Sequence, residues 1–342
     1  MNRRALAWLA AGLGALVLLA IIGQRQTAPT TSSVDTMFLP GLMDSLDDVD
    51  SVAIVAAGNT MVATLDRGSE GWTVRERGDY RADLTKVRHT LLSLAEANII
   101  EAKTANPELH AMLGVEDIDA TDATGLAVTL EGPATPISVI IGETAGDYRR
   151  YVRRTGEPQS YLINRDPEVG GSAADWLDAA VLDLPAARVR SVTVTHPDGE
   201  VVRVSKMSSE QPNFAVDAIP EDRSLLYDSV ANVMASVLQD LTLEDVERVG
   251  DSNEAETVTE ITTFDGLVLT VRGLEREDGT WIRFTANPAP EQPAAGEAGA
   301  EFDPTIEAQE LNARLGGWRF RIPAYKFEQL TRRMDDLLQA QA

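Results

Sequence analysis

Short segments in which apolar and polar residues alternate follow one another along most of the chain. Leu126, Val128 and Leu130 alternate with smaller or polar residues, as expected for a strand with one buried face. Turns containing Gly, Asn or Asp separate such segments. The pattern predicts strands over residues 51–55, 61–65, 72–74, 126–130, 137–141, 148–154 and 160–163.

A different spacing of apolar residues predicts helices between these strands. Behind Asp83, a preferred residue for capping a helix N-terminus, four apolar residues recur at helical intervals. The four are Leu84, Val87, Leu91 and Leu94. Residues 107–114 begin with Pro and end with Gly, which is typical of a short helix. Another helical segment is expected over residues 175–182.

The order of these elements repeats at a spacing of about 140 residues, which indicates two copies of one module. Trp72 corresponds to Phe214, and the helix start at Asp83 corresponds to Asp222. The second apolar stripe is Leu226, Val230, Val233 and Val237. We therefore predict modules over residues 51–183 and 189–342.

The second module has two further features. Residues 287–312 are rich in Pro, Ala and Glu and are predicted to be a mobile insert. From Pro323 onward the chain predicts a last amphipathic helix, whose apolar stripe is Phe327, Leu330, Met334, Leu337 and Leu338. We expect this stripe either to pack on the sheet of its own module or to dock on a partner protein.

Residues 5–23 contain no charge and are long enough, as a helix, to cross the hydrocarbon core of a bilayer. Arg3 and Arg4 precede them, so the N-terminus is expected in the cytoplasm. We predict a membrane anchor over residues 1–25 and a linker over residues 26–50. The protein is then a single-pass protein of the cytoplasmic (inner) membrane with a periplasmic C-terminal part; a cleaved secretory signal is the alternative.

Taken together, these elements predict the α+β fold class. One N-terminal transmembrane helix is followed by two repeated modules of antiparallel sheet packed on helices.

The amino-acid composition limits the classes of ligand and of chemistry that are open to this chain. The net charge is −24, which disfavours binding to nucleic acid and to anionic lipid surfaces. The chain has no Cys, which excludes disulfides and thiolate catalysis. Its hydrophobic fraction of 44% is ordinary for folded domains.

No catalytic or metal-binding motif is present in the sequence. The three histidines, His89, His110 and His196, have no partner at the spacing of metal ligands. Gly170-Gly171-Ser172 does not form the G-x-S-x-G nucleophile motif. We therefore predict a non-enzymatic protein without catalytic residues, metal or cofactor. The alternative is a hydrolase that uses Asp or Glu for acid–base catalysis.

One basic stretch stands out in this acidic chain. It consists of Arg149, Arg150, Tyr151, Arg153 and Arg154. Guanidinium groups bind carboxylates and phosphates through paired hydrogen bonds, so the stretch is a candidate binding site. The alternative is that these arginines neutralise neighbouring Asp and Glu side chains on a solvated strand.

Several short motifs occur in an order that resembles a known family. They are Trp72 in a strand, Ala82-Asp83, Leu113-Gly114-Val115, Ile141-Gly142-Glu143, Tyr151-Val152-Arg153 and Tyr161. From roughly residue 50 to 340 the chain resembles the DUF4340 family of bacterial envelope proteins. The resemblance implies one N-terminal anchoring helix and a gene beside an ABC transporter and an auxiliary protein of the gliding-motility type. It implies no catalytic or binding residues.

Two functional hypotheses follow. The first is a membrane-anchored, non-enzymatic accessory or scaffold subunit of an envelope transport complex of the ABC type, bound to the membrane through residues 5–23. The second is a module that binds an anionic envelope ligand, such as a glycan or a lipid head group, through the basic stretch.

Overall fold

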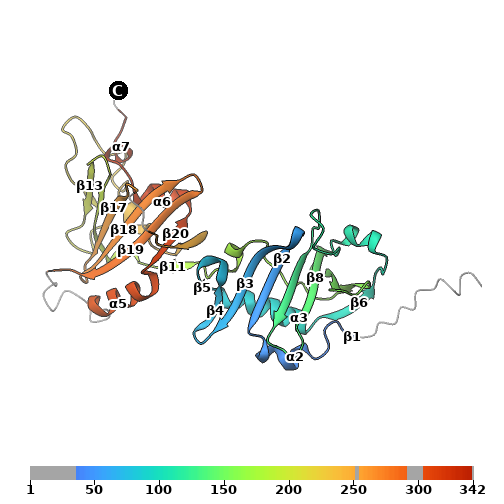
Figure 1. Cartoon of the computed structure of the whole chain (residues 1–342). Helices are drawn as coiled ribbons and strands as arrows, with labels where there is room; N and C mark the ends of the chain where they lie inside the picture. Colours follow the sequence, from blue (N-terminus) through green and yellow to red (C-terminus); the bar gives the residue numbers. More distant parts are fainter. Residues whose placement is uncertain (1–35, 251–253, 291–302, 341–342) are drawn as a thin grey trace, which may run out of the picture.

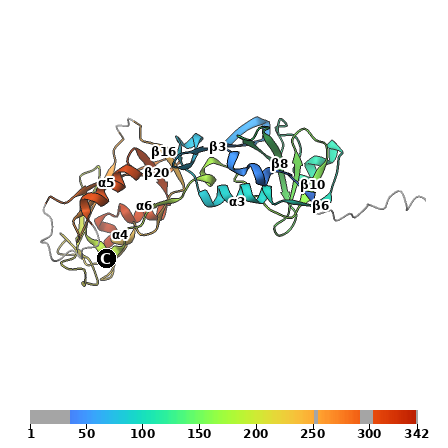
Figure 2. The same ribbon diagram turned by 90° about the horizontal axis from the view of Figure 1, so that it is seen from below.

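The computed structural model describes residues 36–250, 254–290 and 303–340 of the 342-residue chain. Two large antiparallel sheets lie one after the other and give an elongated arrangement in both views (Figures 1 and 2). We call residues 36–176 the first unit and residues 189–340 the second unit. A small sheet lies between them and is formed by β11 (Ala180–Leu182) and β15 (Leu241–Thr242).

The first unit is built on a ten-stranded sheet in which every neighbouring pair is antiparallel. Its strands, in spatial order, are β1 (Thr36–Met37), β6 (Asn98–Ala102), β10 (Ser160–Ile163), β9 (Arg150–Arg154), β8 (Ile137–Thr144), β7 (Leu126–Glu131), β2 (Ser51–Ala56), β3 (Thr60–Gly68), β4 (Gly71–Val74) and β5 (Tyr80–Arg81).

Helix α3 (Leu84–Ala95) packs on one face of this sheet through Val87, Leu91 and Leu94. The carboxylate of Asp83 accepts hydrogen bonds from the amides of Thr85 and Lys86, so the predicted cap is confirmed. The shorter helical segments are α2 (Leu42–Ser45), η1 (Leu46–Asp48), η2 (Ala57–Asn59), η3 (Arg75–Arg77), η4 (Pro107–Leu113) and η5 (Ala173–Trp176). The predicted helix over residues 107–114 corresponds to η4, which ends at Gly114 with a φ of 65°.

The second unit is built on an eight-stranded antiparallel sheet. Its strands, in spatial order, are β14 (Ala215–Val216), β13 (Val201–Ser205), β12 (Val189–Thr195), β17 (Thr257–Thr263), β18 (Leu267–Arg276), β19 (Gly279–Pro288), β20 (Trp318–Ile322) and β16 (Asp245–Arg248). The other elements are η6 (Ala186–Arg188), α4 (Asn232–Ser236), α5 (Pro304–Leu315), α6 (Ala324–Leu330) and α7 (Met334–Leu337).

The two sheets share one strand order. In the first unit the order β4-β3-β2-β7-β8-β9-β10-β6 is extended by β5 at one edge and by β1 at the other. In the second unit the order is β14-β13-β12-β17-β18-β19-β20-β16. The proposed module boundaries at residues 51–183 and 189–342 stay a prediction.

The predicted α+β class with an N-terminal transmembrane helix is wrong for the part of the chain that the structure describes. Antiparallel sheet dominates there, and α3 and α5, the longest helices among the described residues, have 12 residues each. None of the described helices combines the length and the apolar character needed to span a bilayer. The expected membrane helix over residues 5–23 lies outside the described residues.

The predicted helix after Asp222 is largely absent, because a distant segment takes up its backbone hydrogen bonds. Only α4 is helical within the stripe. The Leu226 amide instead donates to the Leu337 carbonyl at 2.9 Å, and Leu225 forms an isolated bridge with Leu338. Residues 224–226 are thus held extended, and turns over residues 228–231 lead into α4.

The predicted C-terminal helix is interrupted between α6 and α7. The Thr331 hydroxyl donates to the Phe327 carbonyl at 2.9 Å, and the Met334 amide donates to the Glu200 carboxylate at 2.9 Å. Phe327, Leu330, Leu337 and Leu338 are nevertheless buried. The stripe therefore packs within its own unit.

Three other segments differ from their predicted structure. Residues 304–315, placed in a mobile insert by the sequence, form α5, whose first amides are capped by Asp303. Residues 36–50, predicted as linker, contain β1, α2 and η1, and their Phe38, Leu42 and Val49 are buried. The predicted helix over residues 175–182 is replaced by the end of η5 and by β11.

Candidate functional site at the junction of the two units

The arginines of the basic stretch lie on β9 and use their guanidinium groups within the first unit. Arg150 binds both carboxylate oxygens of Asp166, at 2.9 Å each, and also donates to the Gly142 carbonyl at 3.1 Å. These bonds fix the loop that carries Asp166 against the end of β8. The Arg150 guanidinium is therefore already paired in the way that an anionic ligand would require.

Arg153 is the most deeply buried of these residues, with 3% of its surface exposed. It donates to the carbonyls of Val115 at 2.7 Å and Glu157 at 2.9 Å, and it pairs with the Asp117 carboxylate. Tyr151 lies on the same sheet face and packs with a small apolar cluster that includes Val115. On this face Arg153 and Tyr151 therefore hold segment 113–118 against the sheet.

Arg154 points to the opposite face, which confirms the alternation expected for a strand. Its guanidinium donates to the Phe38 carbonyl and lies 5.0 Å from the Phe38 ring centroid and 5.4 Å from that of Tyr161. Arg149, just before β9, is exposed. A ligand at this stretch would therefore have to displace the contacts of three of its four arginines.

We expect Arg153→Ala to destabilise the first unit by about 3 kcal/mol, because it leaves the buried Val115 carbonyl without its donor and removes the partly buried bond to the Glu157 carbonyl. Arg149→Ala, a matched change on an exposed residue, is expected to change stability by less than about 0.5 kcal/mol. Urea denaturation of both variants tests this. Equal effects of the two substitutions would contradict the structural role of Arg153.

The histidines contact backbone carbonyls and lie apart from one another in the sequence. The His110 Nε2 atom lies 2.9 Å from the Pro158 carbonyl, and that of His89 lies 3.1 Å from the Asp166 carbonyl. His196 is buried, with its Nε2 atom 3.5 Å from the Arg332 carbonyl. Within residues 36–250, 254–290 and 303–340, no three potential metal-ligating side chains gather closely enough to hold an ion.

Charged and aromatic residues that are far apart in the sequence meet where the two units join. Arg77, from η3 of the first unit, binds both carboxylate oxygens of Asp245 on β16 of the second unit, one of them at 3.0 Å. Arg248, on the same strand, donates to the Gly78 carbonyl at 3.0 and 3.2 Å. Its guanidinium lies 3.6 Å from the centroid of the Trp318 ring. We call this set of contacts the junction.

Tyr80 completes the junction from the edge strand β5. Its ring meets Trp318 edge-on, with the centroids 4.9 Å apart, and lies 6.1 Å from Phe320. Such aromatic pairs contribute beyond the area that they bury. Burial raises the pKa of the Tyr80 phenol. Its hydroxyl oxygen is buried and has no hydrogen-bond partner among the described residues.

Tyr80→Phe is therefore expected to leave the protein as stable as the wild type or to stabilise it by about 1 kcal/mol, because it removes a buried polar atom that has no partner. Tyr80→Ala removes the ring contacts as well, and we expect it to cost about 3 kcal/mol. Thermal denaturation of both variants checks the prediction. A clear loss of stability in Tyr80→Phe would show that the hydroxyl makes a bond.

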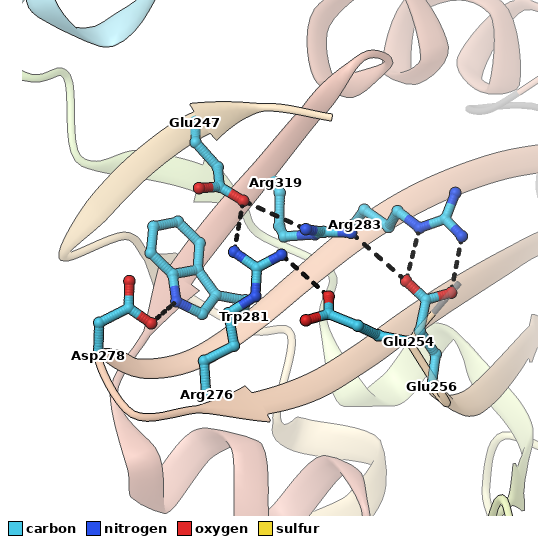
Figure 3. Close-up of polar contacts among 8 residues, drawn as sticks. All are labelled: Glu247, Glu254, Glu256, Arg276, Asp278, Trp281, Arg283 and Arg319. Carbon is cyan, nitrogen blue, oxygen red and sulfur yellow. Dashed lines mark hydrogen bonds and ion pairs between the residues drawn. The ribbon is translucent and has the colours of Figure 1, made fainter. Parts of the chain in front are cut away.

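Beside the junction, one face of the second sheet carries a network of ion pairs (Figure 3). Glu247, on β16, accepts from Arg276 at 2.8 Å and from Arg319 at 3.2 Å. Arg276 also reaches Glu254, at 3.1 Å. The strand pairing of β16 with β20 places Glu247 opposite Arg319.

Glu256 closes the network on its other side. Arg283 donates to both of its oxygens, at 2.9 and 2.6 Å, and Arg319 lies 3.8 Å away. The hydrogen bond from Arg283 lowers the pKa of the Glu256 carboxyl and raises that of the Arg283 guanidinium. The side chains of Glu256 and Arg319 are only 9% and 3% exposed. Such buried ions are tolerated only with their partners in place.

The network combines charges of both signs. Arg276, Arg283 and Arg319 face Glu247, Glu254 and Glu256, and a fourth arginine, Arg272, lies 4.0 Å from Glu256. Asp278 accepts from the indole N–H of Trp281 at 3.1 Å. An arrangement of this kind cross-links β16, β18, β19 and β20.

A hollow of about 310 Å³ lies between the junction and this network. Residues 76–78 of the first unit line one side, and residues 245–248 with Asp278 and Trp281 of the second unit line the other. The sequence did not identify the residues of the junction and the network as a site. For Trp318 and Arg319 the available signal was the alternation of aromatic and basic residues in Trp318-Arg319-Phe320-Arg321, which predicts a strand with one charged face.

Comparison with known proteins gives a family but no relative of known activity. The profile described as "Domain of unknown function (DUF4340)" matches residues 72–295, which include Tyr80, Arg77, Asp245 and the glutamates of the network. No curated protein and no solved structure gives a match. Because the matched range covers more than half of the 342 residues, the chain belongs to the DUF4340 family.

Proposed function

We propose that this protein is a non-enzymatic accessory subunit of an envelope transport complex, in which its two sheet units act as one rigid scaffold for partner proteins. The junction is the observation that carries the proposal. A two-unit protein that closes around a substrate needs a contact that opens, whereas a scaffold needs one that holds its units at a fixed angle.

The junction has the composition of a fixed contact. The bidentate pair of Arg77 with Asp245 fixes direction as well as distance, because the guanidinium and carboxylate groups are both planar. Arg248 and Tyr80 both contact the Trp318 ring. The Arg248 guanidinium forms a cation–π contact with it, and the Tyr80 ring packs against it edge-on. Relative motion of the units would break the contacts that cross between them: the Arg77–Asp245 pair, the bonds from Arg248 to the Gly78 carbonyl and the packing of Tyr80 on Trp318.

The partner class and the location come from the sequence. The family resemblance implies an ABC transporter as partner, and the uncharged segment 5–23 implies association with the cytoplasmic membrane, with the two units on its outer side. The alternative role, binding of an anionic ligand at the basic stretch, is not proposed, because Arg150, Arg153 and Arg154 are bonded within the first unit.

An affinity pull-down of the full-length protein from membranes tests the proposal. We expect transporter subunits to be recovered with the wild type, and fewer of them with the double variant Arg77→Ala, Arg248→Ala, in which the junction is weakened. The matched control is Arg67→Ala, Arg75→Ala, in which both substituted arginines lie outside the junction. Failure of the wild type to recover any transporter subunit would overturn the proposal.

The rigidity of the scaffold is tested separately. Spin labels placed on exposed residues Glu70 and Glu277, one in each unit, should give one narrow distance distribution in the wild type. The distribution should broaden in Arg77→Ala, Arg248→Ala. A broad distribution in the wild type would contradict the fixed junction.

A further inference from the structure

The second unit contains a groove of about 680 Å³, within the usual size range of ligand-binding sites. Most of its lining comes from three segments: residues 226–227, the end of β18 at residues 273–275, and the end of α6 with the turn that follows it. His196, Ala255, Thr257 and Asp336 complete the lining. Figure 1 shows α7, which borders this turn, at the end of the second unit remote from the first. The groove is therefore separate from the junction.

One wall of the groove exposes apolar side chains on a fixed backbone. Leu226 and Tyr227 are 46% and 58% exposed. They do not lie on a loose loop, because the Leu226 amide donates to the Leu337 carbonyl and the Gln339 amide donates to the Ser224 carbonyl, both at 2.9 Å. The exposed leucine and tyrosine are thus held open to solvent by the C-terminal segment.

The floor of the groove depends on a glycine. A Cβ atom at Gly273 would lie 2.7 Å from the buried ring of Phe327. The missing side chain lets α6 approach β18 and leaves the Phe327 ring at the base of the groove. An apolar side chain that enters would therefore meet Leu226 on one side and Phe327 below.

The charges that line the groove are mainly negative. Glu275, Glu328 and Asp336 contribute three negative charges, and Arg332 contributes one positive charge. Arg333 also lines the groove, but its charge is cancelled by Asp198, at 2.8 Å, and by Glu200. Counted together with Asp198 and Glu200, these residues carry five negative and two positive charges, an excess of three negative charges, in a protein whose net charge is −24.

We propose that this groove binds a basic, amphipathic segment of a partner protein. The apolar side chains of the partner segment would bury Leu226 and the Tyr227 ring. A Lys or Arg side chain of the segment would pair with Glu275 or Glu328 and lie over the Tyr227 ring. An acidic segment is disfavoured by charge. The inference rests on the proposed function only in identifying that partner with a subunit of the transport complex.

Photo-crosslinking in cells tests where and what the groove binds. A photoreactive phenylalanine replaces Tyr227 in the full-length protein, and in the control it replaces Tyr325, which is equally exposed (57%) on α6 and does not line the groove. We expect an adduct at position 227 and none at 325, and the crosslinked peptide should be basic and amphipathic. No adduct at 227, an adduct with lipid, or an acidic peptide would overturn the inference.

Charge variants distinguish the groove from the proposed function. We expect Glu275→Gln, Glu328→Gln to reduce recovery of the crosslinked partner about tenfold in the pull-down. The control Glu210→Gln, Glu221→Gln changes two exposed glutamates elsewhere and should not reduce it. If the wild type recovers transporter subunits and the groove variant recovers them equally, the groove inference fails and the proposed function stands. If the adduct at 227 identifies a basic segment of a protein that is not a transporter subunit, the groove inference stands and the proposed function fails.

Discussion

Replacing Glu256 with Gln is expected to lower the free energy of unfolding by about 3 kcal/mol. The substitution keeps the shape of the side chain but removes the negative charge that faces Arg283 and Arg319. Arg319 is almost fully buried, so water cannot replace the lost partner. Urea denaturation measures the difference.

Glu254→Gln is the matched control for this prediction. Glu254 belongs to the same network and pairs with Arg276, but 47% of its side chain is exposed. Exposed ion pairs contribute little, so we expect a loss of less than about 1 kcal/mol. If both substitutions destabilised the protein equally, burial would not be the reason for the effect.

The same residue makes stability depend on pH. Because the pKa of Glu256 is lowered in the folded protein, the folded state binds its proton more weakly than the unfolded chain does. The resulting stabilisation is complete above the ordinary carboxyl pKa of 4.5 and is lost as the pH falls below it. The wild type should therefore lose more stability than Glu256→Gln between pH 5 and pH 3, as read from denaturation midpoints.

Removing residues 324–342 is expected to prevent the second unit from folding. The truncation removes four buried apolar residues, Phe327, Leu330, Leu337 and Leu338. At about 1.5–3 kcal/mol each, their burial amounts to about 6–12 kcal/mol, which is comparable to the whole stability of a domain. Limited proteolysis should then digest the second unit and leave a fragment that contains the first.

Tyr325→Ala provides the control for the truncation. Tyr325 lies on α6 but is exposed, so we expect a change of less than about 0.5 kcal/mol. Survival of the thermal transition of the second unit after truncation, with loss only of a partner, would mean that α6 and α7 dock on another protein instead of stabilising their own sheet.

The sequence predicted those elements whose signals are local. Alternation at Leu126, Val128 and Leu130 identified β7, and Asp83 identified the start of α3. The helical stripe after Asp222 misled for a non-local reason. Its intervals suit a helix, but residues 337–339, more than a hundred positions later, bind the backbone of residues 224–226 and hold it extended.

The candidate site was beyond prediction for a related reason. Arg77 and Asp245 are 168 positions apart, and each is an ordinary surface charge in its own sequence context. Glu256, just before β17, and Arg319, on β20, become a buried ion pair only because β17, β18, β19 and β20 lie side by side. By contrast, the basic stretch stood out locally, and Arg150, Arg153 and Arg154 pair with Asp166, Asp117 and Glu157 of their own unit.

The two sheets share a strand order, but the edge formed by β6 in the first and by β16 in the second is covered differently. In the first sheet β6 is paired with β1 at Asn98 and Ile99, so part of its outer edge is covered. In the second sheet the equivalent strand, β16, is the last strand, and its outer side faces Arg77 and Gly78 of the first unit. An unpaired strand edge is a template for pairing with another chain. Keeping both units on one polypeptide thus places η3 of the first unit beside this edge, where a strand of another copy would otherwise have room to pair.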